Sequence, residues 1–321
     1  FSEHPEELDG NLIAYAECDE EDNSHRILTG LKEFKRLKEK EGFDYIACIN
    51  ADYSTGYNLA DINRYIYFGS IGKLLPSFYV RGKETHVGQA YGGLDPNLIL
   101  SELTRLMELN TDLCDEAQGE VTVPPISLKQ ADFKEGYTVQ TALAGYAYYN
   151  FFTHSMSPVD VMAVSRQKAV EAFGNVIRHV NASYRRYCEK SHVDYEPLPW
   201  KSRVYTWEEY CDYLERRRGP EFREHIFRFA QQLNADEPAL DLRLFSVRVI
   251  EEACRWDEDK SPMIVVFFGS IFSARIEMTG KTEKEKELLA AVERAVQTVQ
   301  PVCVNPIQIR MFYPYISDSS F

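Results

Sequence analysis

The sequence predicts an α/β protein in which a second, α+β domain is inserted into the first. Near the start, two patterns of buried strands, residues 12–16 and 44–50, enclose a helical pattern, which is the order of a βαβ unit. Strand and helix patterns then alternate through the middle of the chain, and a last helix and strand follow. We therefore expect a first domain made of residues 1–70 and 276–321, with an inserted domain over residues 71–275.

The helix between the two predicted strands has signals for its start, its buried face and its end. Asn23 or Ser24 can cap its first turn, and Gly42 can end it. Its apolar residues repeat at helical spacing along one face: Ile27, Leu28, Leu31, Phe34 and Leu37. A strand, a helix and a strand within about 40 residues form a crossover connection, which makes the two strands parallel.

Acidic residues follow both predicted strands. Asp19, Glu20 and Glu21 come after the first, and Asp52 comes after the second. Because parallel strands end at the same edge of a sheet, where open α/β sheets bind ligands, we expect these carboxylates to converge. One acidic run alone is better explained as a solvated turn, but two at one edge favour a divalent metal and a general base. A nucleotide site is disfavoured, because a phosphate loop would need glycines where these acids stand.

The inserted domain opens with strand patterns over residues 70–82, where Pro76 favours an edge strand or a bulge. A helix follows, with Asp95 as its cap and Pro96 as its first residue. Residues 139–152 are typical of a strand, and Ser157-Pro158 opens a long helix. This alternation predicts one layer of helices on one layer of sheet.

Residues 190–260 look like a helical addition to this domain. Thr206 and Glu209 form a capping box at the start of one helix, and Gly219-Pro220 ends it. A second helix follows, and Glu237-Pro238 starts a third. The apolar run over residues 263–268 is then a buried strand of the domain's sheet.

The first domain has further elements on either side of the insertion. Residues 65–68 are typical of a strand that follows the βαβ unit. After the insertion, Thr282 and Glu285 form a capping box for a helix, and residues 306–312 follow as a strand. These elements should return the chain to the first domain.

Composition excludes several classes of function. The chain of 321 residues has a net charge of −14, which argues against nucleic acid or an anionic membrane as the main partner. No apolar run approaches the roughly 20 residues of a membrane helix. The seven cysteines are odd in number and widely spaced, which argues against a disulfide framework and favours a cytoplasmic protein. Cys18 and Cys48 fall in the predicted buried strands as small apolar residues.

Two motifs together resemble a known family. Asp19-Glu20-Glu21 follows an apolar strand, and Gly82 to Gly88 forms a glycine-flanked segment around His86. This pattern resembles the dizinc family of aminoacylases, acetylornithine deacetylases and succinyl-diaminopimelate desuccinylases. Four segments are more similar still to the branch of that family used in arginine utilisation: residues 16–22, 72–78, 197–201 and 314–318.

The resemblance implies a zinc-peptidase-like catalytic domain with an inserted lid and dimerisation domain, here enlarged by the helices of residues 190–260. It implies a metal-dependent amide hydrolase of arginine or amino-acid catabolism, acting on a small N-acyl amino acid or a peptide-like substrate. By resemblance, Glu20 is the general base, while Glu21 and Asp52 hold divalent metals, two zinc ions in the intact protein. His86 would reach across a homodimer, formed through the lid, to stabilise the oxyanion.

Some features depart from the family's pattern. The family often has an arginine on the lid strand for a substrate carboxylate, whereas this strand offers Asn150, which can donate hydrogen bonds without a charge. The H-x-D triplet His192 to Asp194 is expected in a loop without a metal role. Since further histidine ligands would be needed, we expect a chain truncated at both ends and inactive alone. The alternative is a non-catalytic dimeric binding or scaffolding protein with a vestigial metal site.

Overall fold

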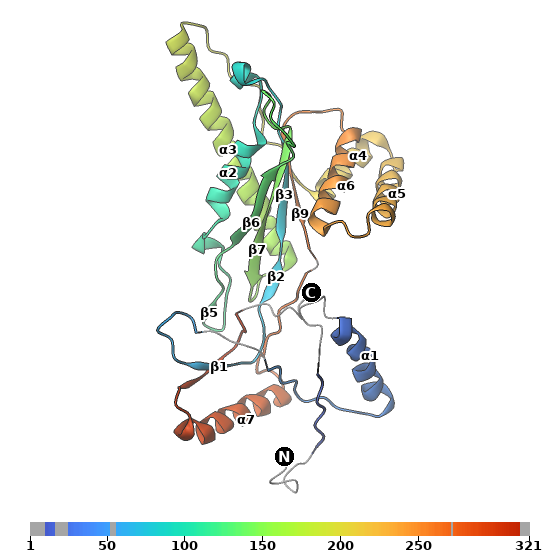
Figure 1. The fold of residues 1–321 in the computed structure, drawn as a ribbon, viewed down its shortest axis with the longest axis vertical. Helices are drawn as coiled ribbons and strands as arrows, with labels where there is room; N and C mark the ends of the chain where they lie inside the picture. Colours follow the sequence, from blue (N-terminus) through green and yellow to red (C-terminus); the bar gives the residue numbers. More distant parts are fainter. Residues whose placement is uncertain (1–9, 17–24, 52–55, 271, 315–321) are drawn as a thin grey trace. The chain divides into compact units, whose positions relative to one another are not determined.

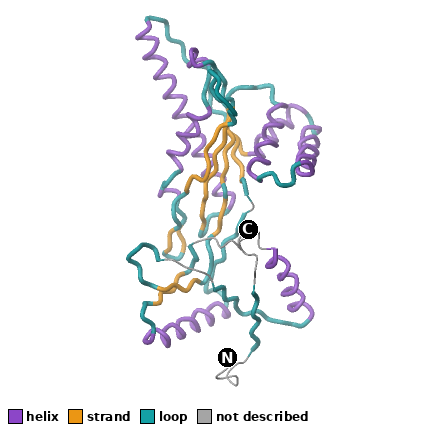
Figure 2. Tube along the Cα trace, viewed as in Figure 1, coloured by secondary structure: helices purple, strands orange, loops and turns teal. Residues whose placement is uncertain are grey.

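The structure is a computed structural model that describes residues 10–16, 25–51, 56–270 and 272–314. Its fold is mixed α/β, as expected, and it divides into two compact units (Figures 1 and 2). The terminal unit comprises the described residues of 1–68 and 278–310. The central unit comprises the described residues of 69–277 together with 311–314.

The terminal unit contains a pair of parallel strands. Its elements are α1 (His25–Lys40), β1 (Arg64–Tyr67), α7 (Glu283–Val299), the 3-10 turn η4 (Gln300–Val302) and β10 (Ile307–Arg310). Strands β1 and β10 pair in parallel, with Tyr65 opposite Gln308. Thr282 forms the predicted capping box at the start of α7. In the same first turn, Lys284 pairs with Asp44, with its Nζ 2.6 Å from Oδ1 of that residue.

Helix α1 confirms the predicted helix. It ends just before Gly42, whose φ of 73° lies in the left-handed region that glycine adopts without strain. Phe34 on α1 contacts the ring of Tyr15 at 5.5 Å and that of Tyr45 at 6.1 Å. The hydroxyl of each tyrosine donates to a backbone carbonyl of this helix. The segments before and after α1 therefore both pack on the helix.

The prediction of a βαβ unit around α1 is wrong for its two strands. Residues 12–16 and 44–50 have no regular secondary structure and form no strand pairing with any described segment. Ile46 is 76% exposed and Ile49 is 91% exposed, so the apolar run is not buried here. Cys48 is also exposed, against the expectation of a buried thiol. A strand is defined by hydrogen bonds to a neighbour, and β1 and β10 bond to each other instead.

The central unit is built on a mixed sheet. Among the described residues its strands are β2 (Gly72–Leu74), β3 (Pro76–Arg81), β6 (Ile126–Asp132), β7 (Ala144–Thr153), β8 (Val204–Thr206) and β9 (Met263–Phe268). Across the sheet the order is β6, β7, β3, β9 and β8, and β2 pairs with the end of β7 beside β3. All these pairs are antiparallel except β8 with β9. A small hairpin, β4 (Glu116–Ala117) and β5 (Glu120–Val121), lies outside the sheet.

Helices cover both faces of this sheet (Figure 1). One face packs against α2 (Pro96–Met107) and α3 (Pro158–Ser191). The other packs against the helical insert: α4 (Trp207–Arg218), α5 (Glu221–Asp236) and α6 (Leu242–Trp256). Alternate residues of β9 enter the two cores, Ile264 on the first face and Val265 on the second. That explains why β9 is apolar at every position.

A buried ion cluster fastens the insert to β3. The carboxylate of Asp257, at the end of α6, lies 3.5 Å from Nη2 of Arg81 on β3 and 3.2 Å from Nη2 of Arg203. The hydroxyl of Tyr210 on α4 donates to the same carboxylate at 3.2 Å. Asp257 is 2% exposed and Arg81 is 6% exposed. The cluster therefore joins two helices of the insert to a central strand in an environment shielded from water.

A second buried carboxylate fixes the turn between β7 and α3. Oδ2 of Asp115 accepts backbone N–H groups of His154 at 2.8 Å, Ser155 at 2.6 Å and Met156 at 2.6 Å. The hydroxyl of Ser155 donates to Oδ1. Burial alone would raise the pKa of Asp115, but these hydrogen bonds to the charged form outweigh it and lower the pKa.

Two expectations for the central unit are corrected. β3 is a central strand rather than an edge, and Pro76 is tolerated because it is the first residue of that strand. The third insert helix begins at Leu242, later than Glu237-Pro238 suggested. Its start is set by Asp241, whose carboxylate accepts the first free N–H groups of α6. Within the described part of the chain, no helix combines the length and apolar character of a membrane span.

Candidate functional site

The acidic residues assigned from the sequence to base and metal-binding roles, Glu20, Glu21 and Asp52, lie outside the residues that the structure describes. Among the described residues, no group of three histidine, cysteine, aspartate or glutamate side chains is placed to hold a metal ion. The metal centre therefore stays a prediction. His86 and Asn150, by contrast, are both described and both lie in the central unit.

His86 lies on the loop after β3, where it caps the 3-10 turn η2 (Val87–Gly92). Nδ1 of its ring accepts the backbone N–H of Gly88 at 3.0 Å. A ring nitrogen that accepts a hydrogen bond carries no proton, so in neutral His86 the proton is on Nε2. Because the residue is exposed, the structure leaves an Nε2–H donor accessible at the surface of the central unit.

The loop around His86 is held on both sides by backbone pairing. His86 forms a bridge with Gln140, and the N–H of Val87 donates to the carbonyl of Val139 at 2.9 Å. The flanking glycines have a packing reason: a Cβ at Gly88 would stand 3.1 Å from Nδ1 of His86. A Cβ at Gly82 would overlap the carbonyl oxygen of Leu94. Gly88 thus allows the close approach to the His86 ring, and Gly82 allows the close approach of the segment around Leu94.

Asn150 is a half-buried residue of β7, on the sheet face that the insert partly covers. Its Oδ1 is buried without a hydrogen-bond partner among the described residues. Buried polar atoms are usually paired, so this amide is suited to receiving a ligand group. It shares its face with Tyr148, two residues earlier on the same strand.

The structure does not bring His86 and Asn150 together within one chain. The His86 loop adjoins the start of β7, since the N–H of Gly82 donates to the carbonyl of Leu143. At about 3.3 Å per residue, Asn150 lies about 20 Å further along β7 than Ala144. The two side chains therefore cannot contact one small substrate from the same central unit.

Sequence reasoning missed Arg243, which the insert places on the same sheet face. A Cβ at Gly269, the residue after β9, would stand 3.0 Å from Cγ of Arg243 and against the hydroxyl of Ser77. Ser77 is directly opposite Tyr148, so Arg243 lies on the face that bears Asn150. Its guanidinium pairs with Asp241, the cap of α6, through Nε and Oδ1 at 2.9 Å.

No local pattern marks Arg243, because its position depends on how the insert folds back onto the sheet. Its effect is visible at Tyr146, whose pKa is raised by burial and by the neighbouring Tyr148 and Asp241, and partly lowered again by Arg243. Strand β7 has no arginine of its own, and the first turn of α6 supplies one on the face that bears Asn150.

Comparison with known proteins identifies two proteins that are similar to this chain. No protein-family model matches it. Protein RocB of Bacillus subtilis (strain 168) is 32% identical to it over 321 residues, which is 100% of this chain and 56% of RocB. This chain is RocB-like. The uncharacterized protein YqjN of the same organism is 31% identical over 261 residues, 81% of this chain and 47% of YqjN.

The chain spans about half the length of the curated relatives it matches. The alignment with RocB runs through both units and through the helical insert, so these helices belong to the region shared with RocB. The match confirms the resemblance of short segments to the arginine-utilisation branch, as similarity to RocB; membership of the dizinc family stays a prediction. The chemistry of a dizinc hydrolase remains a proposal.

Proposed function

We propose that the intact RocB-like protein is a metal-dependent amide hydrolase, of the deacylase or peptidase type, acting in arginine or other amino-acid catabolism. The observation that supports this most is the hydrogen bonding of the His86 ring. Its Nδ1 is occupied by the N–H of Gly88, which leaves neutral Nε2–H as a donor on an exposed, pinned loop. A preorganised donor of this kind stabilises the oxyanion that forms when an amide carbonyl is attacked.

The acidic residues would do the remaining chemistry. Glu20 would take the proton from the attacking water and deliver it to the leaving nitrogen. Glu21 and Asp52 would hold the divalent metal, with two zinc ions proposed for the intact protein. Carboxylate oxygens are suitable ligands for zinc, which when bound would polarise the scissile carbonyl as a Lewis acid.

The substrate we propose is a small N-acyl amino acid or a peptide-like amide. Asn150 offers an unpaired buried amide oxygen, and Arg243 offers a guanidinium on the same sheet face. A guanidinium can bind a carboxylate through two parallel hydrogen bonds, once its pairing with Asp241 is exchanged for the substrate. Arg243 would therefore take the place of the arginine that β7 lacks.

A homodimer formed through the central unit, acting as the lid, would let His86 serve the partner's site. Service of the partner's site is consistent with the distance between His86 and Asn150 within one chain, because the two residues need not then contact the same substrate molecule from one chain. One available surface is β6, an edge strand that pairs only with β7 among the described strands. Leu128 on β6 is 53% exposed, and an exposed edge with an apolar side chain is suited to pairing with a second copy.

A cytoplasmic location goes with this proposal. The six described cysteines are free, and free thiols persist in a reducing compartment. We expect no nucleic-acid partner, because the net charge of −14 repels phosphate backbones.

The test is metal content and amidase activity of the intact protein on N-acyl amino acids, for wild type, Glu20→Ala and Glu21→Ala. We expect Glu20→Ala to retain metal and lose activity by roughly 10²–10⁴-fold, as for loss of a general base. Glu21→Ala should lose metal as well. The matched control is Glu39→Ala on α1: the side chain of Glu39 is 62% exposed, and this substitution should leave metal content and activity unchanged.

A second candidate is a non-catalytic dimeric binding or scaffolding protein. The feature that favours it is the helical insert, which covers part of the sheet face where a lid would meet its substrate. No bound metal and no hydrolysis of N-acyl amino acids or dipeptides by the intact protein would support this candidate and refute the hydrolase.

A further inference from the structure

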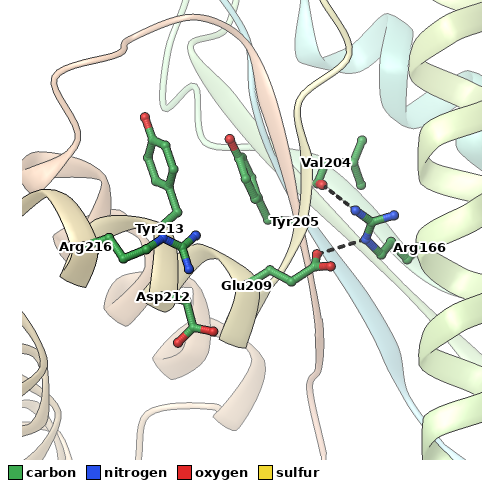
Figure 3. A pocket seen from close by; sticks show the side chains of 7 residues that line it. All are labelled: Arg166, Val204, Tyr205, Glu209, Asp212, Tyr213 and Arg216. Carbon is green, nitrogen blue, oxygen red and sulfur yellow. Dashed lines mark hydrogen bonds and ion pairs between the residues drawn. The ribbon is translucent and has the colours of Figure 1, made fainter.

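A pocket lies at the β8 edge of the central sheet, away from the strand that bears Asn150. Its volume is about 310 Å³. Three elements line it (Figure 3): α3 contributes Arg166, β8 contributes Val204 and Tyr205, and α4 contributes Glu209, Asp212, Tyr213 and Arg216. A pocket of this size accommodates a small metabolite rather than a peptide.

Both carboxylates of the pocket already have cationic partners. Glu209 Oε2 accepts from Nε of Arg166 at 2.9 Å, as Figure 3 shows, and also from the backbone N–H of Thr206. Asp212 pairs with Arg223, which lies outside the lining. The anionic groups of the pocket are therefore neutralised within the protein.

Arg216 differs from these paired groups. Within the described chain it makes no hydrogen bond or ion pair, although its side chain lines the pocket. Two further guanidinium groups lie close by on the aromatic rings, with Arg217 4.6 Å from the centroid of Tyr213 and Arg203 5.9 Å from that of Tyr205. Arg203 is itself paired with Asp257 and Asp259, so Arg216 is the guanidinium of the lining that has no carboxylate partner among the described residues.

The remaining wall is aromatic. The rings of Tyr205 and Tyr213 lie 5.5 Å apart at an angle of 34°, with Val204 beside them. The hydroxyl of Tyr213 lies 3.5 Å from Oδ1 of the buried Asp257, which orients this ring. Phenol rings bind flat apolar groups by stacking or by edge contacts.

We propose that this pocket binds a small carboxylate with a flat aromatic body. Arg216 would bind the carboxylate through two parallel N–H donors, the geometry in which guanidinium groups recognise planar anions. Tyr205 and Tyr213 would contact the ring of the ligand. The site is separate from the proposed hydrolase chemistry and does not depend on it.

Equilibrium dialysis of the intact protein with radiolabelled benzoate tests the site. Wild type should bind one benzoate per chain saturably, and Arg216→Gln should weaken binding at least tenfold. Tyr205→Leu should also weaken it. The matched control is Arg228→Gln on α5, an exposed arginine of the same insert whose nearest carboxylate is 3.7 Å away, and this variant should bind like wild type.

Unlabelled competitors test the chemical class. Benzamide, which has the ring without the charge, and acetate, which has the charge without the ring, should each compete at least tenfold more weakly than benzoate. Absence of saturable binding to wild type would overturn the proposal. So would an affinity of Arg216→Gln equal to that of wild type, or equal competition by acetate and benzoate.

Discussion

The substitution Asp257→Ala removes the centre of the ion cluster that joins the helical insert to β3. The side chain of Asp257 is 1% exposed, and it is contacted by Arg203 at 3.2 Å, Arg81 at 3.5 Å and the hydroxyl of Tyr210 at 3.2 Å. The substitution therefore leaves two buried guanidinium groups without their shared carboxylate. We expect the insert to be destabilised more than any other part of the central unit.

The expected loss follows from these three contacts. The hydrogen bonds from Arg203 and Tyr210 to the charged carboxylate, at about 1.5 kcal/mol each, sum to about 3 kcal/mol, and the ion pair with Arg81 adds to this. Removing one partner from a buried ion pair costs about 3–5 kcal/mol, which agrees. Arg81 and Arg203 both retain the backbone carbonyl of Ser261 as an acceptor, which places the loss in the lower part of that range.

Urea unfolding followed by tryptophan fluorescence measures this loss. The chain has three tryptophans, and Trp200, Trp207 and Trp256 all lie in or beside the insert. The control is the neighbouring residue: Glu258 also pairs with an arginine, Arg218, but its side chain is 77% exposed. Exposed pairs contribute about 0–1 kcal/mol, so Glu258→Ala should barely shift the transition.

A double substitution separates charge from packing. Arg81→Met with Asp257→Leu removes both ends of the buried pair, and such replacements are often neutral or stabilising. Arg203 loses Asp257 in this variant but keeps Asp259 and the carbonyl of Ser261. We therefore expect the double variant to recover part of the stability that Asp257→Ala loses. If Asp257→Ala and Glu258→Ala unfold within about 1 kcal/mol of each other, the cluster does not anchor the insert and the reasoning is refuted.

Three further predictions concern the site and the turn before α3. His86→Ala should lower kcat of the intact protein by about 10²–10³-fold with little change in KM, as for loss of an oxyanion donor, while His192→Ala should not. Arg243→Ala should raise KM for a substrate with a free carboxylate and leave KM for the corresponding carboxamide unchanged. Arg248→Ala on the same helix is the control and should change neither value. Equal effects of Arg243→Ala on both substrates would contradict carboxylate binding. Because the pKa of Asp115 is lowered in the folded state, its stabilising contribution is present above the unfolded pKa of about 3.9 and is lost as the pH falls through the folded pKa. Urea unfolding between pH 7 and pH 3 should therefore show a smaller loss of stability with falling pH in Asp115→Asn than in wild type.

Elements whose signals are local were predicted well from the sequence. The capping boxes at Thr206 and Thr282 mark the first turns of α4 and α7, and Ser157 forms another at the start of α3. A cap and the turn that it stabilises lie within four residues, so the sequence contains the whole interaction. The same holds for α1, which Gly42 ends as expected.

Features that depend on distant contacts were predicted less well. The apolar runs 12–16 and 44–50 have the composition of strands, but strand formation also requires a paired neighbour, and no described segment supplies one. Pro76 suggested an edge, yet β3 is central, because the first position of a strand tolerates the missing N–H. Arg243 could not be found at all, since its place is set by the folding of α6 onto the sheet.

The parallel pairing of β8 with β9 has a consequence for the evolution of the insert. Two parallel neighbours start at the same end of the sheet, so the chain leaving β8 must travel the length of the sheet before it can enter β9. Helices α4 to α6 provide that return path. The number of these helices can vary among relatives, whereas parallel pairing of β8 with β9 always requires a crossover connection. A relative with a single helix here could keep the sheet intact, but one with a tight turn could not.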